Sequence, residues 1–190
     1  KTADEKRYGG YADGAKKAYD WLCLKNGTID TDRQARLVRP LALGLLDGEK
    51  KENVQKRLAQ AVERRKYRIG TGFLSTPFVL PVLTETGRHD LAYKMLENEE
   101  APGWLYEVKQ GATTMWEDWE GSEFASLNHY AQGAVCQWLF EYAEGIRVDG
   151  ENHFTIAPVS GGTLTHAASD YRRNHGLAQT GWRRTARRLR

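Results

Sequence analysis

Residues 73–100, FLSTPFVLPVLTETGRHDLAYKMLENEE, decide the fold of this chain. The first part, Phe73 to Leu83, is nearly all apolar, so a helix there is predicted to be buried on most sides. The second part, Arg88 to Glu100, repeats apolar residues three and four positions apart and predicts an amphipathic helix. Gly87 lies between them as a helix-ending residue. We therefore expect an inner helix followed by an outer helix.

Similar stripes of apolar residues occur on both sides of this pair. Their members are Tyr11, Ala15, Ala18, Tyr19 and Leu22, then Leu37, Leu41, Leu45 and Leu46, then Val54, Leu58, Ala61 and Val62. Pro40 is expected to kink the second helix or lie in its first turn, and Gly48 to end it. The third stripe lies in the strongly charged segment 49–66, which predicts an outward-facing helix. A last helix is predicted over residues 126–142, closed by Gly145.

The pattern changes near residue 148. The stretches His153–Pro158 and Thr163–Ala168 are typical of strands, and Gly161-Gly162 is expected to form the turn between them. The predicted fold is mainly α, part of an α/α toroid, followed by a short β segment. We expect two parts, residues 1–147 from the later half of the toroid and residues 148–190 from the start of a truncated β domain.

Composition and charge exclude several classes of protein. Hydrophobic residues make up 40% and charged residues 28% of the 190 residues, which is typical of a folded globular chain. Five arginines fall in the last eight residues, and removing their charges from the net +3 leaves −2 for the rest. The main body therefore gives no support for nucleic-acid binding. No apolar run is long enough for a membrane span, and Cys23 and Cys136 are expected to be buried free thiols.

The segment with the most chemistry is residues 111–130, GATTMWEDWEGSEFASLNHY. It combines four carboxylates with two tryptophans and a histidine. Sugars present hydroxyl edges and apolar faces, so acidic acceptors beside flat aromatic rings suit them. Glycosidic cleavage needs carboxyl groups, and Glu117, between Trp116 and Trp119, is expected to be partly desolvated, which raises a carboxyl pKa. If the segment is extended, Trp119 shares the face of Glu117.

The same residues also allow plainer interpretations. The segment can be a solvated acidic loop whose tryptophans pack into the core, because Trp-Glu pairs have no fixed mechanism. His129, at the start of a buried helix, can be a core or capping residue. The scattered histidines give no support for a metal site, and no phosphate-binding loop or other cofactor motif is present. Residue spacing alone leaves these alternatives open.

Three motifs, in order along the chain, resemble the bacterial α-L-rhamnosidases of glycoside hydrolase family 78. They are TGFLSTPFVLP from Thr71, GATTMWEDW from Gly111 and SLNHY from Ser126, and IAPVSGGTLTHA from Ile156 resembles the start of that family's following β-sandwich. The resemblance implies an (α/α)6 six-hairpin toroid and an inverting hydrolase that removes terminal α-L-rhamnose from a glycoside or polysaccharide.

The resemblance also implies roles for single residues. Glu117 falls on the general base that activates water, and His129 on a histidine that lines the sugar pocket. Trp116, Trp119 and Asn128 are further candidates for contact with the sugar. The family's general acid comes from the earlier half of the toroid, which has no counterpart here, so we expect this chain alone to be inactive. Other toroid glycosidases, polysaccharide lyases and non-catalytic carbohydrate-binding helical domains are the alternatives.

Overall fold

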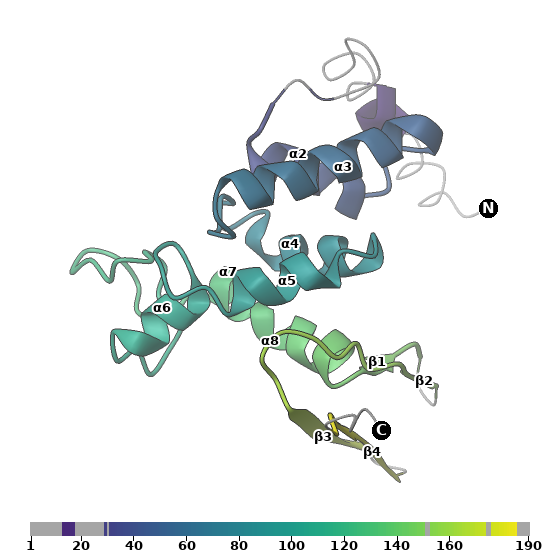
Figure 1. Ribbon diagram of the computed structural model, residues 1–190, viewed down its shortest axis with the longest axis vertical. Helices are drawn as coiled ribbons and strands as arrows, with labels where there is room; N and C mark the ends of the chain where they lie inside the picture. Colours follow the sequence, from purple (N-terminus) through teal and green to yellow (C-terminus); the bar gives the residue numbers. More distant parts are fainter. Residues whose placement is uncertain (1–12, 18–28, 30, 151–152, 174–175, 186–190) are drawn as a thin grey trace, which may run out of the picture.

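A computed structural model describes residues 13–17, 29, 31–150, 153–173 and 176–185, and it is rich in helices with a small amount of sheet (Figure 1). The stripe from Tyr11 to Leu22 falls mostly outside these residues; within it, residues 13–17 are helical. The remaining elements are α2 (Gln34–Ala42), α3 (Gly48–Arg64), α4 (Thr76–Glu85), α5 (His89–Leu96), α6 (Trp104–Lys109), α7 (Tyr130–Gly133), α8 (Val135–Trp138), the π-helix η1 (Leu139–Ala143), β1 (Ile146–Val148), β2 (Phe154–Ile156), β3 (His166–Arg173) and β4 (Gly176–Arg183).

Helices α2 and α3 form the first described hairpin. All four apolar residues predicted to face inward from α3 are buried, which confirms the outward-facing helix. The predicted stop at Gly48 is wrong, because this glycine is the first residue of α3. The chain leaves α2 at Gly44, whose φ of +61° is in the left-handed region that glycine tolerates. Pro40 lies inside α2 near its C-terminal end rather than in its first turn.

Helices α4 and α5 confirm the predicted inner and outer pair. Pro77 lies in the first turn of α4, where a backbone N–H would have no acceptor within the helix, so its absence in proline costs no hydrogen bond. Val79, Leu80, Val82 and Leu83 are all at most 3% exposed. In the stretch 78–83 the residues that are not buried are Phe78, which is 42% exposed, and Pro81, which is partly buried.

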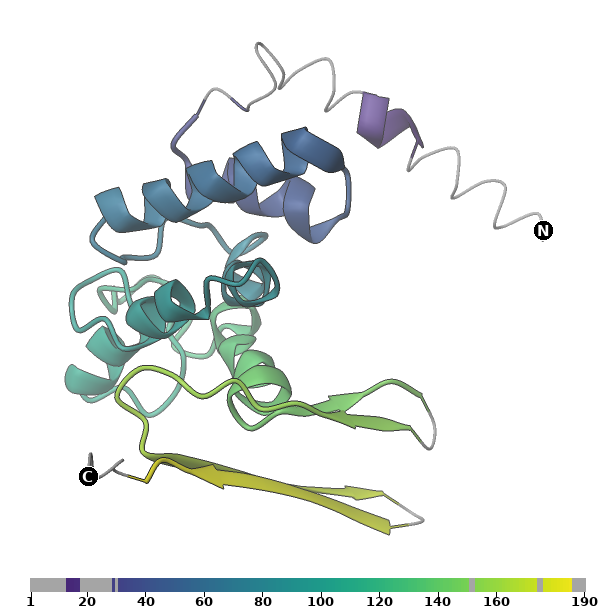
Figure 2. The same cartoon turned by 45° about the vertical axis from the view of Figure 1, so that its right-hand side comes forward.

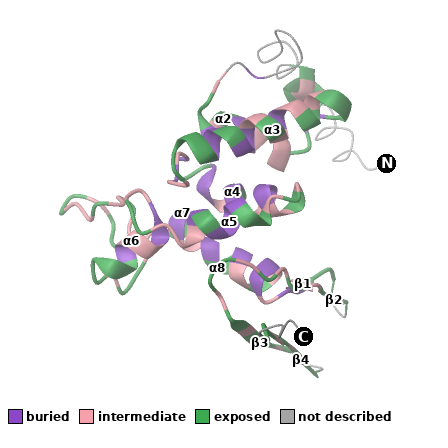
Figure 3. Cartoon of the chain, in the orientation of Figure 1, coloured by how far each residue is buried: buried purple, intermediate pink, exposed green. Residues whose placement is uncertain are grey.

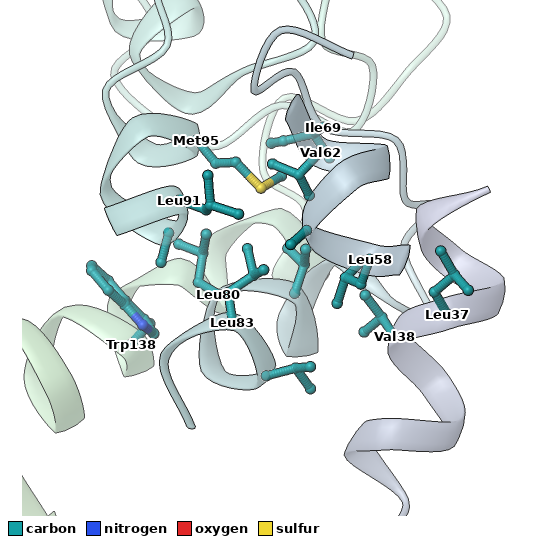
Figure 4. Close-up of a cluster of buried hydrophobic side chains, with 14 of the residues drawn as sticks. Leu37, Val38, Leu58, Val62, Ile69, Leu80, Leu83, Leu91, Met95 and Trp138 are labelled. Carbon is teal, nitrogen blue, oxygen red and sulfur yellow. The ribbon is translucent and has the colours of Figure 1, made fainter. Parts of the chain in front are cut away.

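The helices pack around α4. Helix α4 contacts α2, α5, α7 and α8, while α3 contacts both α2 and α5. Figure 4 shows side chains from these helices meeting in one cluster, with Leu83 and Leu91 between the α2–α3 hairpin and Trp138 of α8. One continuous hydrophobic core therefore joins the two hairpins to the last helices.

The last predicted helix starts later than expected. Residues 126–129 are not helical, and the chain then forms α7, α8 and η1 in succession. The reason is that hydrogen bonds from the backbone of residues 115–117 and the side chain of Thr114 tie residues 126–129 to the preceding loop and so remove them from the helix. Cys136 on α8 is exposed, so the prediction of a buried thiol is wrong at this position, and Cys23 lies outside the described residues.

The β segment consists of two separate antiparallel hairpins, β1–β2 and β3–β4. Gly161-Gly162 lies in the connection between the hairpins (Figure 2), where the chain does turn at Gly162-Thr163. The strands before and after it, β2 and β3, do not pair with each other. In β3 and β4 no residue with a described side chain is buried (Figure 3). Trp182 nevertheless anchors β4 to the helices, since its indole Nε1 donates to the carbonyl of Ala143 at 2.7 Å.

The predicted boundary between residues 147 and 148 falls within β1, and it stays a prediction. The segment after β2 also reaches back to the helices. The hydroxyl of Tyr93 on α5 donates to the carbonyl of Val159 at 2.6 Å, and the carboxylate of Glu97 accepts from the Thr163 backbone at 2.7 Å. Within the described part of the chain, no helix is long and apolar enough to cross a bilayer.

Candidate active site

The loop between α6 and α7 is closed on itself by backbone hydrogen bonds. The N–H of Glu117 donates to the carbonyl of Ser126 at 2.8 Å, and the N–H of His129 donates to the carbonyl of Met115 at 2.8 Å. The hydroxyl of Thr114 donates to the carbonyl of Leu127. These bonds bring the Trp-Glu motif and the Asn-His-Tyr motif, which are separated by ten residues of sequence, next to each other.

Glu117 is held in place but is exposed to solvent. Its Oε2 accepts a hydrogen bond from the N–H of Ser126 at 3.0 Å, and its own carbonyl accepts from Gln132 Nε2 at 3.0 Å. The prediction that flanking indoles desolvate this carboxylate is therefore wrong for this chain. One hydrogen bond holds the side chain of Glu117 and the other holds its backbone, while the residue remains exposed.

The two tryptophans pack on different partners on either side of a turn. Residues 118–121 form a turn, with the N–H of Gly121 donating to the carbonyl of Asp118 at 2.9 Å, so the alternation of an extended segment does not hold. Trp119 turns inward and meets Trp104 edge to face, with ring centroids 5.8 Å apart. Trp116 lies against Gly121, so closely that a Cβ atom on that glycine would come within 2.7 Å of the indole Cζ3.

His129 combines a capping role with an aromatic surrounding. Its Nδ1 accepts from the N–H of Ala131 at 3.3 Å and so caps α7. An accepting Nδ1 carries no proton, which leaves the hydrogen on Nε2 as a donor. The ring stacks on Tyr130 at 5.1 Å between centroids and meets Phe73 edge to face at 6.1 Å. The adjacent Asn128 is exposed, and its N–H donates to the Ser126 hydroxyl at 3.1 Å.

Two buried residues beneath the loop were not predicted from the sequence. Glu107 on α6 is fully buried, and its Oε2 accepts from the N–H of Trp116 at 3.1 Å. Desolvation raises the pKa of Glu107 to about 7, and this one backbone hydrogen bond only partly offsets it. Gln132 on α7 is 5% exposed, and its side-chain Nε2 donates to the carbonyl of Glu117. Its backbone carbonyl accepts from Trp104 Nε1 at 2.9 Å. Glu107 and Gln132 therefore form hydrogen bonds with Trp116 and Glu117, the two adjacent residues of the Trp-Glu motif.

A weak signal for Glu107 was present in the sequence. It lies three positions after Trp104, so on a helix it shares the face of a core tryptophan. Its Oε1 and the Oε1 of Gln132 are both buried and have no hydrogen-bond partner among the described residues. For metals, no group of three or more histidine, cysteine, aspartate or glutamate side chains in the described ranges is arranged to hold an ion.

Comparison with known families explains this arrangement. Residues 1–143 match the profile described as the bacterial alpha-L-rhamnosidase 6 hairpin glycosidase domain. The helical hairpins and the loop between α6 and α7 therefore belong to a six-hairpin glycosidase domain. This match covers most of the chain. The chain belongs to the bacterial α-L-rhamnosidase family.

Curated relatives agree with this assignment. An alpha-L-rhamnosidase of Formosa agariphila is 35% identical over 195 residues, covering 96% of this chain and 21% of the relative. An alpha-L-rhamnosidase of Streptomyces avermitilis is 34% identical over 168 residues, covering 83% of this chain and 16% of the relative. The chain thus spans about a fifth of the length of the curated relatives it matches.

Solved structures show the same fold. The crystal structure of a native α-L-rhamnosidase from Aspergillus terreus superposes with a TM-score of 0.87 at 30% identity, covering 94% of this chain and 22% of that one. The Streptomyces avermitilis α-L-rhamnosidase, solved in complex with L-rhamnose, superposes with a TM-score of 0.81 at 31% identity, covering 90% of this chain and 18% of that one.

Proposed function

We propose that this chain is the later half of the α/α toroid of an inverting α-L-rhamnosidase. In this proposal residues 1–147 complete the toroid, residues 148–190 begin the β-sandwich, and the first half of the toroid is supplied by a further segment. The chain's share of its relatives supports this. So do large apolar side chains exposed around the loop, since Phe124 is 99%, Tyr130 77% and Leu127 55% exposed.

Glu117 acts as the general base in this mechanism. One of its oxygens is held by the N–H of Ser126, while the other accepts no hydrogen bond from any described residue. The second oxygen takes a proton from a water molecule, and the water oxygen then attacks the anomeric carbon of the rhamnose. Attack from the side opposite to the leaving oxygen inverts the configuration of that carbon.

The neighbouring residues bind the sugar. His129 offers Nε2–H to a hydroxyl of the rhamnose, because its Nδ1 is engaged in capping α7. The exposed side chain of Asn128 offers a further polar contact, and Trp116 and Trp119 shape the wall of the pocket. The substrate is a glycoside or polysaccharide with a terminal α-L-rhamnose.

A second carboxyl group protonates the departing oxygen. In an inverting enzyme it lies roughly 6.5–9.5 Å from the base, which leaves room for the attacking water. In this proposal that acid belongs to the first half of the toroid. The chain alone is therefore expected to show no hydrolysis.

The observation that carries the proposal is the backbone pairing of residues 115–117 with residues 126–129, which brings Glu117 and His129 together. The test uses the complete enzyme and replaces Glu117 by Gln. We expect kcat for a chromogenic α-L-rhamnoside to fall by about 10²–10⁴-fold, as for loss of a general base, while rhamnose binding persists. Glu120→Gln is the matched control, because it removes the same charge from an exposed residue of the same loop.

Four results would contradict the proposal. Unchanged turnover in Glu117→Gln would exclude this residue as the base. Cleavage of other glycosides but not of rhamnosides would favour a different toroid glycosidase, and an unsaturated sugar product would favour a lyase. Rhamnose binding by the wild type with no turnover of any substrate would favour a non-catalytic binding domain. Proton NMR of the first product formed distinguishes inversion from retention.

A further inference from the structure

A cleft lined by arginines lies beside the candidate active site. It has a volume of about 600 Å³, and its walls come from α2, the segment after α3, and the loop between α6 and α7. Arg33, Arg36, Arg39 and Arg65 line it together with Thr71 and Trp119. A cleft with four guanidinium groups and one indole presents positive charge next to an aromatic edge.

These four arginines are not neutralised by carboxylates of the described residues. Arg39 Nε donates to the carbonyl of Ala35 at 3.2 Å and Arg65 Nε to the carbonyl of Ile69 at 3.3 Å, so both make only backbone hydrogen bonds. By contrast, Asp32 pairs with Arg57 at 3.3 Å and with Arg64 at 2.8 Å. The cationic side chains of the cleft therefore have capacity for an external anion, and the planar guanidinium suits a carboxylate.

The wall of the cleft is held in a fixed shape. Gln34, only 1% exposed, donates through Nε2 to the carbonyl of Arg68 at 3.1 Å and accepts through Oε1 from the N–H of Gly70 at 2.7 Å. Gly70 packs so closely on this amide that a Cβ atom would lie 2.9 Å from Gln34 Cδ. The hydroxyls of Thr71 and Thr76 lie 2.8 Å apart and tie the wall to α4. A wall fixed in this way has little ordering to undergo when it binds a ligand.

The cleft adjoins the residues that we assign to the rhamnose. Trp119 lies two residues after Glu117 in the same loop. A smaller hollow of about 170 Å³ shares Ala35 and Arg39 with the cleft and is also lined by Phe73. The ring of Phe73 in turn contacts the ring of His129. A glycan held at His129 can therefore extend along Phe73 toward the arginines.

We propose that the arginine cleft is a subsite for an acidic sugar, and that the preferred substrate carries rhamnose on a uronic acid residue or close to one. This inference rests on the proposed function. Arg36 and Arg65 bind the uronate carboxylate, and Trp119 borders the sugar ring. A sulfate ester has related charge chemistry, and a sulfated substrate distinguishes the two sources of the anion.

The test compares two substrates of the complete enzyme, a rhamnosyl-glucuronic acid disaccharide and its neutral rhamnosyl-glucose counterpart. We expect kcat/KM to be about tenfold higher for the acidic one, equivalent to roughly one charge-assisted hydrogen bond. The preference should shrink as salt is added. Arg36→Gln and Arg65→Gln should each remove most of it and leave kcat/KM for the neutral disaccharide unchanged.

Arg64→Gln provides the matched control. It removes the same charge one residue from Arg65, but Arg64 pairs with Asp32 and does not line the cleft. An equal loss in Arg64→Gln and Arg65→Gln would mean that the general field of the protein causes the preference, and would overturn the subsite. Equal rates on both disaccharides would overturn it too and leave the rhamnosidase proposal intact. A preference for the sulfated substrate over the uronate would overturn the assignment to a uronic acid.

Failure of the proposed function gives a different result, because neither disaccharide would then be cleaved. In that case binding of a glucuronic acid oligosaccharide, followed by tryptophan fluorescence or calorimetry, still tests the cleft. Binding that weakens in Arg36→Gln and Arg65→Gln but not in Arg64→Gln supports the subsite without hydrolysis. Absence of binding to the wild type would overturn it.

Discussion

The α4–α5 hairpin and the loop between α6 and α7 are stabilised in opposite ways. The hairpin buries side chains at regular helical spacing, and those at most 1% exposed are Val79, Leu80, Leu83, Leu91, Ala92, Tyr93 and Met95. In the loop, by contrast, Glu117, Phe124 and Asn128 are exposed, and the shape depends on backbone hydrogen bonds and on the buried Glu107 and Gln132. The core thus depends on apolar volume, and the site on a few polar contacts.

The largest effect is expected from a cavity in the hairpin. Leu83→Ala removes a side chain that is 1% exposed and should lower the free energy of unfolding by about 2–5 kcal/mol. Phe78→Ala on the same helix is the control, because that side chain is 42% exposed and should cost clearly less. Urea denaturation followed by circular dichroism measures both. Equal losses would show that α4 is not buried on the face that the structure gives.

A glycine in the loop should affect activity more than stability. Gly121 has a φ of +72° and lies against the Trp116 indole, so Gly121→Ala should displace Trp116 and with it Glu117. In the complete enzyme that we propose, we expect kcat/KM for a rhamnoside to fall on the order of 10²-fold, as for a reacting group misplaced by about 1 Å. Gly111→Ala is the control, since Gly111 has a φ of +86° but an added Cβ would meet nothing within 4 Å.

The outcome for Gly111→Ala separates strain from displacement. Both substitutions place alanine in the left-handed region, which costs roughly 1–2 kcal/mol. Only Gly121→Ala also collides with a side chain of the site. A similar loss of activity in both variants would mean that backbone strain in the loop, rather than the position of Trp116, controls the rate.

The same contrast decides what could be predicted from sequence. The hairpin was predictable because its signals, a nearly continuous apolar run before Gly87 and an apolar periodicity after it, lie within the elements themselves. The helix predicted from residue 126 was wrong at its start because residues 126–129 pair with residues 115–117, and a local pattern does not contain such a partner. The alternation considered for Trp119 required an extended segment, and the turn ending at Gly121 interrupts that segment.

The candidate site was found by resemblance rather than by spacing. The motifs around Glu117 and His129 marked both residues, whereas their spacing left a solvated loop and a capping histidine as open alternatives. His129 does cap α7 in the structure. Glu107 and Gln132 were missed because their importance comes from burial beneath a loop, and burial depends on the tertiary structure.

The buried carboxyl group of Glu107, which accepts a hydrogen bond from the loop at Trp116, makes the stability of the protein depend on pH. Its pKa is raised from an ordinary value of 4.5 to about 7 by burial, so the folded state holds its proton more tightly than the unfolded state does. The contribution of Glu107 to the free energy of unfolding is therefore complete below about pH 4.5, and it is lost as the pH rises to about 7. Relative to Glu107→Gln, the wild type should lose on the order of 2–3 kcal/mol over this range.

Thermal melts at pH 5 and pH 8 measure this difference. The melting temperature of Glu107→Gln should depend less on pH than that of the wild type. Glu120→Gln should behave as the wild type does, because Glu120 is exposed. Parallel pH dependence in the wild type and Glu107→Gln would contradict a buried carboxyl beneath Trp116.

The smallest effect is expected at the surface of the hairpin, where Asp90 pairs with Arg88 at 3.0 Å and Arg88 reaches Glu63 of α3 at 3.0 Å. The hydrogen bond from Arg88 lowers the pKa of Asp90 below 3.8, so its contribution is complete above about pH 4 and is lost as the pH falls through the folded value. Both side chains are over a third exposed, and solvent screening limits the cost of Asp90→Asn to below about 1 kcal/mol.

Urea midpoints at pH 7 should show this small loss, and high salt should reduce it further. If Asp90→Asn lowered the free energy of unfolding as much as Leu83→Ala does, the ion pair and not apolar burial would hold α5 on the core. A loss that did not change with salt or acid would contradict a solvent-screened ion pair.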